Sequence, residues 1–434
     1  MSGLMIAAPA SGSGKTTVTL GLLRALADDG VALAPGKAGP DYIDPAFHAA
    51  ASRADCLNYD PWAMRRALLA TNAAAQMHGG RMLLVEAMMG LFDGAADGSG
   101  SPADLAAMLG LPVVLVVDCS RMSHSIAALV RGYADFRADV DVCGVILNKV
   151  GSARHEAMLR EALAKAGVAV LGAIASDPGL ALPERHLGLV QAGEHSALEA
   201  FVRRAAETVR GCVDLDGLIA RAGKSAVPSA PADVARLPPL GQRIAIARDN
   251  AFAFIYPHLL AGWREQGASL SFFSPLRNEA PPADCDAVFL PGGYPELHAA
   301  ALADAATFRA GMIAAGARGA RIYGECGGYM TLGEGLVAAD GTRHAMLGLL
   351  PLVTSFAERR RHLGYRRLVP LAGSGFAQAM TAHEFHYSTM VREGEAERLF
   401  AVTDAVGADL GTAGLRRGNV AGSYMHLIDI AGAS

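Results

Sequence analysis

The sequence has few of the features that mark secreted, membrane-spanning or nucleic-acid-binding proteins. None of its six cysteines belongs to a Cys-x-x-Cys pair, and five lie in apolar or mixed segments, which predicts reduced side chains and a cytoplasmic location. No apolar run reaches membrane-spanning length, and no basic segment with a cleavage site precedes the first apolar residues. The net charge is only -4, so nucleic acid is not an expected partner and an anionic ligand requires a local basic patch.

Hydrophobic residues and glycine are abundant. The chain of 434 residues is 52% hydrophobic and contains 50 glycines, which is typical of a compact protein with two or three domains. In the first half we expect strands at 4–8, 31–37, 82–86, 113–118, 142–148 and 168–174. Helices are expected between most of these strands, for example at 16–28, 103–109, 123–136 and 153–166. Because apolar strands that alternate with helices form parallel sheets covered on both faces, this half predicts an α/β domain.

The composition changes at residues 222–241, where proline, serine and small residues predict a linker. A second series of apolar segments follows at 244–247, 269–273, 287–290 and 321–323 and predicts a second α/β domain. The expected organisation is therefore a domain at 1–221, a linker at 222–241 and a domain at 242–434.

A phosphate-binding loop follows the first expected strand and opens a helix, which is the context that a Walker A motif requires. Pro9 stands where the first glycine of the usual pattern would be, but the Gly-Lys-Thr ending is intact. Backbone N–H groups would hold a triphosphate, Lys15 would reach its β- and γ-phosphates, and Thr16 would bind Mg²⁺. The predicted nucleotide-binding residues are Ser11, Gly12, Ser13, Gly14, Lys15, Thr16 and Thr17.

Acidic residues follow the second and third expected strands, where a doubly wound sheet gathers its ligands. Glu86 ends an apolar strand and is the candidate for the Mg²⁺ ligand of a Walker B motif. Asp41 is a second candidate for the metal or the substrate. Asp44 and Asp93 would bind a second Mg²⁺, position the substrate or simply form turns, because aspartate beside proline or glycine is common in turns.

Polar residues also end the next two strands. Asn148 would read the nucleotide base, although asparagine at a strand end is often only a turn former. Asp118 would reach the nucleotide region from the strand beside it.

Cys326 lies in Gly-Glu-Cys-Gly-Gly, between an apolar strand and a helix-like run. Glycines at such a turn allow the sharp bend that exposes a nucleophile. We expect the helix dipole to lower the pKa of this thiol. On its own, the motif also fits a buried structural cysteine.

Acyl chemistry at Cys326 would need a base and oxyanion donors. Gly293, in Pro-Gly-Gly-Tyr-Pro after another strand, and Gly327 would supply backbone N–H groups for an oxyanion hole. His426, at the end of a short strand near the C-terminus, is the candidate base, since its position after the cysteine suits the order of Cys–His glutaminases.

The residue that would orient His426 is not evident. Ile428, not an acid, stands two residues further on, and Glu384 and Asp429 remain alternatives. Glu384 belongs to the expected strand at 383–388, which is either a wall of the site or a satisfied polar cluster. The basic residues at 359–361 and 366–367 form either a solvated face or a binding patch for carboxylates.

Together these motifs resemble the cobyrinic and hydrogenobyrinic acid a,c-diamide synthases of cobalamin biosynthesis over essentially the full length. The resemblance implies a P-loop NTPase-type domain related to dethiobiotin synthetase, followed by a class I glutamine amidotransferase-like domain. The missing acid at Ile428 agrees with the cobalamin branch, which is described as having only cysteine and histidine. The matching segments are 9–17, 39–45, 86–94, 290–295, 324–328, 383–388 and 422–426.

The resemblance implies a ligase that uses Mg²⁺, ATP and L-glutamine. ATP would phosphorylate a carboxylate of the corrin macrocycle, and ammonia released at Cys326 would displace the phosphate, once at the a and once at the c acetate. Asp41 and Asp44 resemble substrate-placing positions, and Tyr42 between them is assigned to the same substrate site, together with Asp93. Ammonia is mostly ammonium at neutral pH, so a shielded path between the sites is expected.

Several alternatives stay open. The same reaction on cobyrinic acid or a nickel sirohydrochlorin is the nearest, and no motif separates the cobalt-free substrate from these. A P-loop regulatory or partitioning ATPase with an inactive glutaminase-like domain is another, but the Cys326 and His426 pair is intact and the lysine of partitioning ATPases would fall at Ser11. The sequence leaves a homodimer open.

Overall fold

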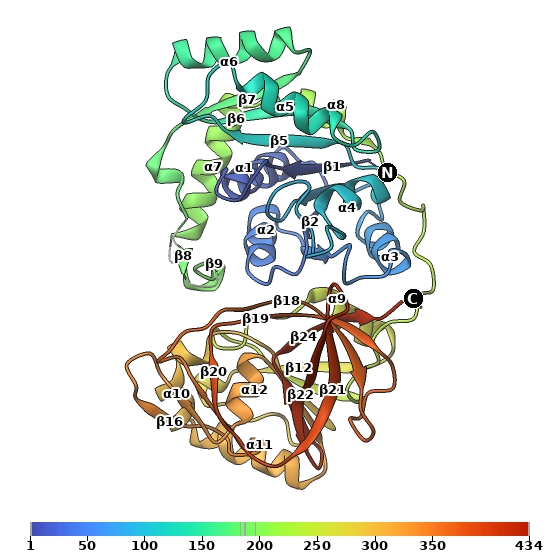
Figure 1. The fold of residues 1–434 in the computed structure, drawn as a ribbon, viewed down its shortest axis with the longest axis vertical. Helices are drawn as coiled ribbons and strands as arrows, with labels where there is room; N and C mark the ends of the chain where they lie inside the picture. Colours follow the sequence, from blue (N-terminus) through green and yellow to red (C-terminus); the bar gives the residue numbers. More distant parts are fainter. Residues whose placement is uncertain (1, 183, 186–187, 196, 433–434) are drawn as a thin grey trace. The chain divides into compact units, whose positions relative to one another are not determined.

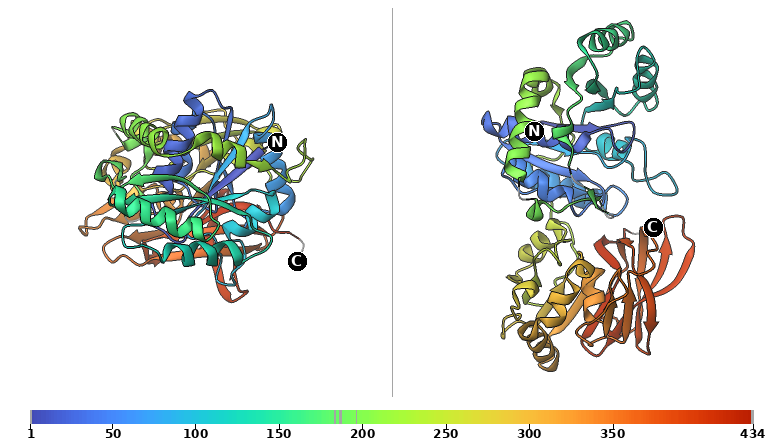
Figure 2. Two further views of the ribbon diagram at one scale, coloured as in Figure 1. Left: turned by 90° about the horizontal axis from the view of Figure 1, so that it is seen from above. Right: turned by 90° about the vertical axis from the view of Figure 1, so that its left-hand side faces the viewer.

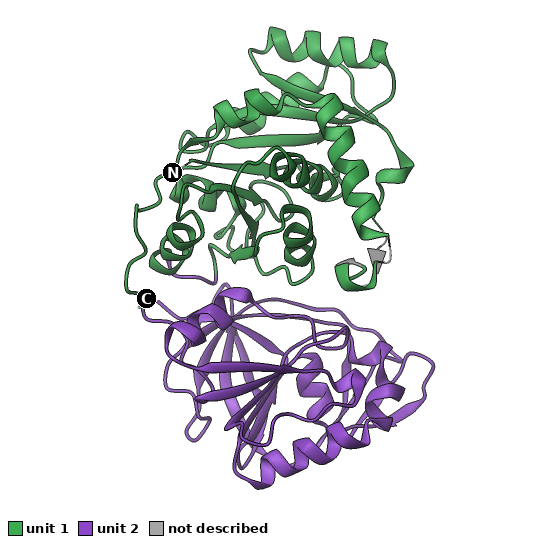
Figure 3. Cartoon of the chain, turned by 180° about the vertical axis from the view of Figure 1, so that it is seen from behind, with its two compact units in different colours: residues 1–62, 66–234 green, residues 63–65, 235–434 purple. Residues whose placement is uncertain are grey.

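The computed structural model describes residues 2–182, 184–185, 188–195 and 197–432. The chain forms two compact units, one of residues 1–62 and 66–234 and the other of residues 63–65 and 235–434 (Figure 3). Within the described ranges, no helix combines the length and the apolar character needed to cross a membrane.

The first unit is built on a sheet in the order β3-β2-β4-β1-β5-β6-β7, in which all these neighbours are parallel. Strands β2, β1, β5, β6 and β7 of this sheet are labelled in Figure 1. A short strand, β10, pairs antiparallel with β1. The strands are β1 (Ser2–Ala7), β2 (Leu33–Ala38), β3 (Leu57–Tyr59), β4 (Met82–Glu86), β5 (Val113–Asp118), β6 (Val142–Val150), β7 (Val170–Ala175) and β10 (Gly223–Lys224). Two further strands, β8 (Glu184–Arg185) and β9 (Gly188–Leu189), form a small separate antiparallel sheet.

Helices lie on both faces of this sheet (Figure 2). Helix α1 packs against α2 and α7, and α5 packs against α6. Gly21 allows the close approach of α1 to α7, because a Cβ there would lie 2.6 Å from the carbonyl oxygen of Ala205. The helices are α1 (Lys15–Asp28), α2 (Asp44–Ser52), α3 (Arg66–Gln76), α4 (Pro102–Leu109), α5 (Ile126–Asp135), α6 (Ala153–Lys165), α7 (Leu198–Cys212) and α8 (Leu215–Arg221).

The second unit contains a sheet in the order β12-β11-β13-β14-β23-β22-β21-β18-β19-β24. Its first five strands are parallel neighbours, and the remaining pairs are antiparallel. The strands of this sheet are β11 (Arg243–Ala247), β12 (Ser269–Phe273), β13 (Ala287–Leu290), β14 (Arg321–Glu325), β18 (His362–Pro370), β19 (Met380–His386), β21 (Glu397–Asp404), β22 (Asp409–Arg417), β23 (Val420–Ser423) and β24 (Met425–Ile430).

A smaller sheet and four α-helices complete this unit. The smaller sheet has the order β16-β15-β17-β20. Its strands are β15 (Gly335–Val337), β16 (Arg343–Ala345), β17 (Leu352–Ser355) and β20 (Thr389–Glu393). The α-helices are α9 (Pro257–Glu265), α10 (Ala299–Asp304), α11 (Ala306–Ala317) and α12 (Gly327–Leu332).

The expected α/β architecture is confirmed in both units. All six strands expected in the first half are present, and those at 82–86 and 113–118 have the expected bounds. The antiparallel strands from β18 onward were not expected, apart from those proposed around residues 383–388 and before His426. His426 does not end a short strand as expected, because it is the second residue of β24.

Candidate active sites

The phosphate-binding loop connects β1 to α1. Gly12 and Gly14 have φ angles of 79° and 86°, which residues with a Cβ rarely adopt, so the loop depends on both glycines. The Ser13 hydroxyl donates to the carbonyl of Ala10 at 2.8 Å, and the Asn148 side-chain amide donates to the carbonyl of Ser13 at 2.9 Å. These bonds hold the loop at the N-terminus of α1, where unsatisfied N–H groups favour an anion.

Lys15 is buried at the first position of α1. Its ammonium donates to the carbonyl of Met89 at 2.6 Å. Burial lowers the pKa of Lys15 to about 8, although the carboxylate of Glu86 opposes this shift. A phosphate group beside Lys15 would favour the charged ammonium, so this lysine is suited to bind an anion.

A cavity of about 260 Å³ adjoins the loop. Gly14, Thr17 and Asn148 line it together with residues 174–178. The Thr17 hydroxyl donates to the carbonyl of Leu180 at 3.1 Å, and Ser11 is exposed. The cavity therefore brings two of the predicted loop residues, Gly14 and Thr17, to one space with Asn148, although the Asn148 amide is bonded to the loop itself.

Glu86, at the end of β4, is the centre of a buried polar network. Its Oε1 accepts hydrogen bonds from the Thr16 hydroxyl at 2.7 Å and from the Lys37 ammonium at 2.9 Å. Its Oε2 lies 2.6 Å from Nε2 of His48. The carboxylate and the Thr16 hydroxyl thus converge as two oxygen ligands of the kind that Mg²⁺ prefers.

Each charged group of this network shifts the pKa values of its neighbours. Burial disfavours the ionised form of Glu86, but Lys37 and His48 hold the pKa of Glu86 well below its usual range. Burial likewise opposes the charge of Lys37, and the neighbouring carboxylates, led by Asp44 and Glu86, raise the pKa of Lys37 above its usual range. Burial, followed by the charge of Asp41, raises the pKa of Asp44 to about 6. Lys37 is therefore a fixed buried cation.

The predicted substrate residues occupy the loop after β2, the start of α2 and the loop after β4. Asp41 accepts from the backbone N–H groups of Ile43 and Asp44 at 2.8 and 2.9 Å, so it forms the turn that precedes α2. Asp44 lies 2.5 Å from the Lys37 ammonium, and Tyr42 is partly exposed. Asp93 accepts from the N–H of Gly90 at 2.8 Å, which is the turn geometry that its sequence context allowed.

Lys37 and His48 both contact Glu86, but neither was expected to belong to a site. The only signal for Lys37 is a charged residue inside an otherwise apolar strand, since β2 is buried throughout. No sequence pattern indicated a role for His48. Its side chain reaches Glu86 because residues 44–52 form α2, and no helix was named for this segment.

In the second unit, Cys326 lies between β14 and α12 in a strained conformation with φ 46° and ψ -104°. The expectation that the helix dipole lowers its pKa is wrong. Burial, followed by the charge of Glu296, raises the pKa of the Cys326 thiol, while the N–H of Gly327 opposes that shift. The resting residue is therefore a neutral thiol that needs a base.

Glycines surround the thiol because there is no space for side chains. A Cβ at Gly328 would lie 1.9 Å from the carbonyl oxygen of Leu290, and one at Gly327 would lie 3.0 Å from the backbone nitrogen of Gly293. The backbone N–H groups of Gly293 and Gly327 are thus neighbours, as an oxyanion hole requires.

His426 is fully buried beside the cysteine. A Cβ at Gly292 would lie 2.3 Å from Cε1 of His426, 3.2 Å from its Nε2 and 3.3 Å from Cβ of Cys326. Burial, with contributions from His383 and His386, holds the pKa of His426 well below its usual value. The site therefore rests as a thiol beside a neutral imidazole.

The two carboxylates considered as partners of His426 make other ion pairs. Asp429 pairs with Arg65 at 2.9 Å, and Glu384 pairs with Arg366 at 2.8 Å. A carboxylate that sequence analysis did not consider, Glu325, has an oxygen 3.9 Å from Nδ1 of His426. The residues at 359–361 and Arg367 are exposed.

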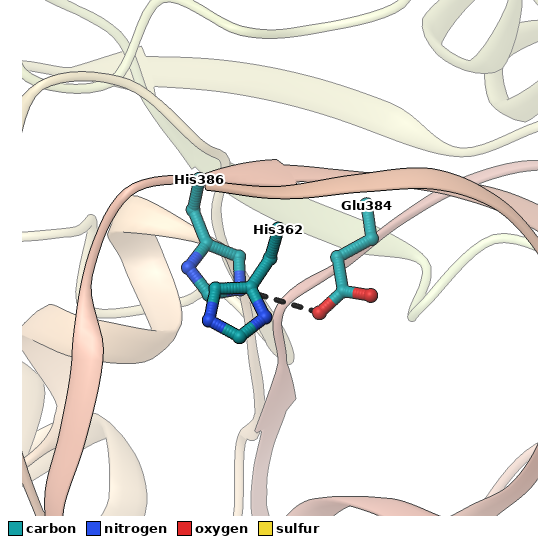
Figure 4. Close-up of side chains that lie close together, drawn as sticks. All are labelled: His362, Glu384 and His386. Atoms are coloured by element: carbon teal, nitrogen blue, oxygen red, sulfur yellow. Dashed lines mark hydrogen bonds and ion pairs between the residues drawn. The ribbon is translucent and has the colours of Figure 1, made fainter. Parts of the chain in front are cut away.

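His362 on β18 and Glu384 and His386 on β19 lie close together (Figure 4). Glu384 lies 3.2 Å from Nε2 of His386, and the two imidazole rings stack with their centroids 4.6 Å apart at 10°. Two nearly parallel rings cannot direct their in-plane lone pairs at one ion, and the guanidinium of Arg366 already holds Glu384. The cluster therefore fits a polar wall better than a metal site.

Two family descriptions match the two halves of the chain. Residues 4–190 match the CobQ/CobB/MinD/ParA nucleotide binding domain, and residues 243–432 match the CobB/CobQ-like glutamine amidotransferase domain. A hydrogenobyrinate a,c-diamide synthase from a Sinorhizobium species is 70% identical over 436 residues, which cover 100% of both chains. Enzymes of the same name from Rhizobium meliloti and Brucella anthropi are 66% and 62% identical, and the alignments cover at least 99% of each chain.

Proposed function

Because the chain belongs to the hydrogenobyrinate a,c-diamide synthase family, we propose that it amidates the a and c acetate groups of hydrogenobyrinate with ATP and glutamine. The observation that carries the proposal is the presence, in one chain that aligns with these enzymes end to end, of a phosphate-binding loop and a buried Cys–His pair. Each of the two motifs supplies one half of an amide-forming reaction.

The first half-reaction activates the carboxylate. A carboxylate oxygen of the substrate attacks the γ-phosphorus of ATP, ADP leaves and an acyl phosphate forms. Lys15 and the N–H groups of residues 11–15 hold the phosphates, and Asp41, Tyr42, Asp44 and Asp93 face the corrin substrate. This step is needed because a free carboxylate has no leaving group for ammonia to displace.

Mg²⁺ fits the oxygens of Thr16 and Glu86, which lie 2.7 Å apart, and Asp41 is the third residue that we assign to it. When bound, the ion would offset the negative charge that the phosphates carry. Lys37, held by Glu86 and Asp44, provides a further fixed positive charge at the same strand ends.

The second half-reaction releases ammonia. The Cys326 sulfur attacks the amide carbon of glutamine while its proton passes to His426, and Gly293 and Gly327 stabilise the oxyanion. The carbon–nitrogen bond breaks as the proton moves from His426 to the leaving nitrogen. Water then hydrolyses the thioester to glutamate, and the released ammonia displaces phosphate from the acyl phosphate.

The test is to incubate the purified protein with glutamine, Mg-ATP and hydrogenobyrinate and to determine product masses. We expect two carboxyl-to-amide conversions. Cys326→Ala should lose the glutamine-dependent product and regain it with ammonium salts, whereas Cys285→Ala, a buried cysteine of the same unit, should behave as the wild type. Parallel reactions with cobyrinate and nickel sirohydrochlorin test the alternative substrates. Conversion of either in preference to hydrogenobyrinate would overturn the substrate assignment.

A further inference from the structure

Glu325 immediately precedes the nucleophile, and its carboxyl group is buried on the side of β14 that faces His426. Only 3% of the residue is exposed. Its Oε1 accepts a hydrogen bond from the N–H of Leu427 at 3.2 Å, and its Oε2 lies 3.9 Å from Nδ1 of His426. One carboxyl group is therefore anchored to the strand that carries the histidine and directed at the histidine ring.

The other ring nitrogen lies on the side of the nucleophile. Nε2 of His426 and Cβ of Cys326 both lie within 3.3 Å of the point that a Cβ at Gly292 would occupy. The order in space is thus Glu325, the imidazole and Cys326, which is the order of an orienting acid, a base and a nucleophile.

Other charged groups near the ring do not take this place. His383 and His386, on β19, both disfavour a protonated His426. Glu384 is held by Arg366 and His386, and Asp429 is held by Arg65. Of the three carboxyl groups, Glu325 is the one with an oxygen near a ring nitrogen of His426, and its charge would stabilise a histidine that has accepted a proton.

We propose that Glu325 is the positioning residue of the glutaminase site, which accepts the Nδ1–H of His426 and so keeps Nε2 unprotonated, ready to accept the proton of Cys326. This inference rests on the glutaminase function proposed above. The separation of 3.9 Å is that of the unliganded site, and such contacts often shorten when a substrate binds.

The surroundings of Glu325 suit this role. The carboxyl borders a cavity of about 120 Å³ that is lined mainly by apolar residues, among them Trp263, Phe376 and Leu427. Burial raises the pKa of Glu325 to about 8, although the N–H of Leu427 opposes the shift. An imidazolium at His426 would favour the carboxylate, so the pair is expected to ionise together during the reaction.

The test compares Glu325→Gln with Glu325→Asp in glutamine hydrolysis between pH 6 and 9. The amide of Glu325→Gln does not ionise. It can donate to Nδ1 of His426, which stabilises the tautomer that carries its proton on Nε2 and cannot accept the proton of Cys326. We expect kcat to fall by at least about 10-fold with KM changed less than about 3-fold, because Glu325 acts behind the histidine. In the wild type we expect kcat to rise with pH near 8, as Glu325 ionises. This rise should disappear in Glu325→Gln and persist in Glu325→Asp.

Two further variants serve as controls. Tyr323→Phe alters the same strand and the same cavity without removing a carboxylate, and Asp429→Asn removes the rival acid. Both should keep the wild-type pH profile, even if Asp429→Asn melts at a lower temperature because Arg65 loses its partner. Melting temperatures of all variants separate loss of folding from loss of catalysis.

The inference is overturned if Glu325→Gln retains kcat within about 3-fold and the wild-type pH profile, or if Asp429→Asn gives the altered profile instead. It is also overturned if the loss in Glu325→Gln is matched by Tyr323→Phe. A wild-type protein that does not hydrolyse glutamine would instead contradict the proposed function itself.

Discussion

Lys37 shows how a single buried charge organises the first unit. Its ammonium is 2.5 Å from Asp44 and 2.9 Å from Glu86, and the Lys37 and Glu86 side chains are 3% and 0% exposed. Removing one partner of such a group leaves an uncompensated charge in a low-dielectric environment, which costs more than the pair itself contributes. The network that holds Thr16 and Glu86 therefore depends on Lys37.

We predict that Lys37→Met lowers the stability of the protein by about 3 kcal/mol and abolishes ammonium-dependent amidation, because Asp44 and Glu86 lose their cation. Urea unfolding monitored by circular dichroism, together with a product assay, measures both effects. Lys165→Met is the matched control, since that lysine forms an exposed pair with Glu161 and should change stability by less than about 0.5 kcal/mol. Equal stability of the two variants would refute the importance of the buried charge.

Residues with a local signature could be predicted from the sequence, and those defined by distant contacts could not. Gly14, Lys15 and Cys326 stand in motifs whose glycines satisfy local backbone requirements. Lys37 and Glu325 acquire their meaning only from partners 49 and 101 positions away, Glu86 and His426. No spacing rule joins such pairs, because strand order, not sequence order, brings them together.

At the scale of elements, α12 packs so closely on the parallel strands that its glycines are structural requirements. The Cβ of any other residue at Gly328 would meet the backbone of Leu290 in β13, which cannot move aside as a flexible side chain can. The position of this short helix in turn determines where Cys326 and the N–H of Gly327 lie.

Gly328→Ala should therefore destabilise the second unit by about 1–3 kcal/mol and reduce glutamine hydrolysis. Gly316→Ala in α11 is the control. A Cβ at Gly316 would lie 3.6 Å from the nearest side-chain atom, which is an ordinary contact distance, and alanine stabilises a helix by about 0.5–1 kcal/mol relative to glycine. Calorimetry of both variants measures the difference. A Gly328→Ala protein as stable as Gly316→Ala would show that α12 shifts freely.

Elements differ in how readily the sequence reveals them. The buried strands β4 and β5 are continuous apolar runs and were expected with their correct bounds. Strands β18 and β22 have few buried residues and carry arginine and glycine, so they lack the alternation that identifies a strand. Helix α2 begins at Asp44-Pro45, which indicates a turn as readily as a helix start.

At the scale of the whole molecule, each of the two units matches one family description, and we assign one half-reaction of the proposed function to each unit. Ammonia released into water at neutral pH becomes mostly ammonium, which is not a nucleophile. A chain that carries both sites gains only if ammonia reaches the acyl phosphate before it is protonated. The advantage is one of effective concentration, and it can be measured without knowledge of the route.

We predict that the wild type, supplied with ¹⁵N-amide glutamine and an equal concentration of unlabelled ammonium, forms product that carries mainly ¹⁵N. A mixture of Lys15→Ala and Cys326→Ala should instead form product in which the label is diluted to the isotope ratio of the bulk ammonium, because ammonia must then cross the solvent between two molecules. Mass spectrometry of the amide product distinguishes these outcomes. The mixture is the control for catalysis, since it contains one working copy of each site. Equal dilution of the label in the wild type and in the mixture would show that ammonia equilibrates with the solvent. Joining the two sites in one chain would then serve some purpose other than ammonia transfer.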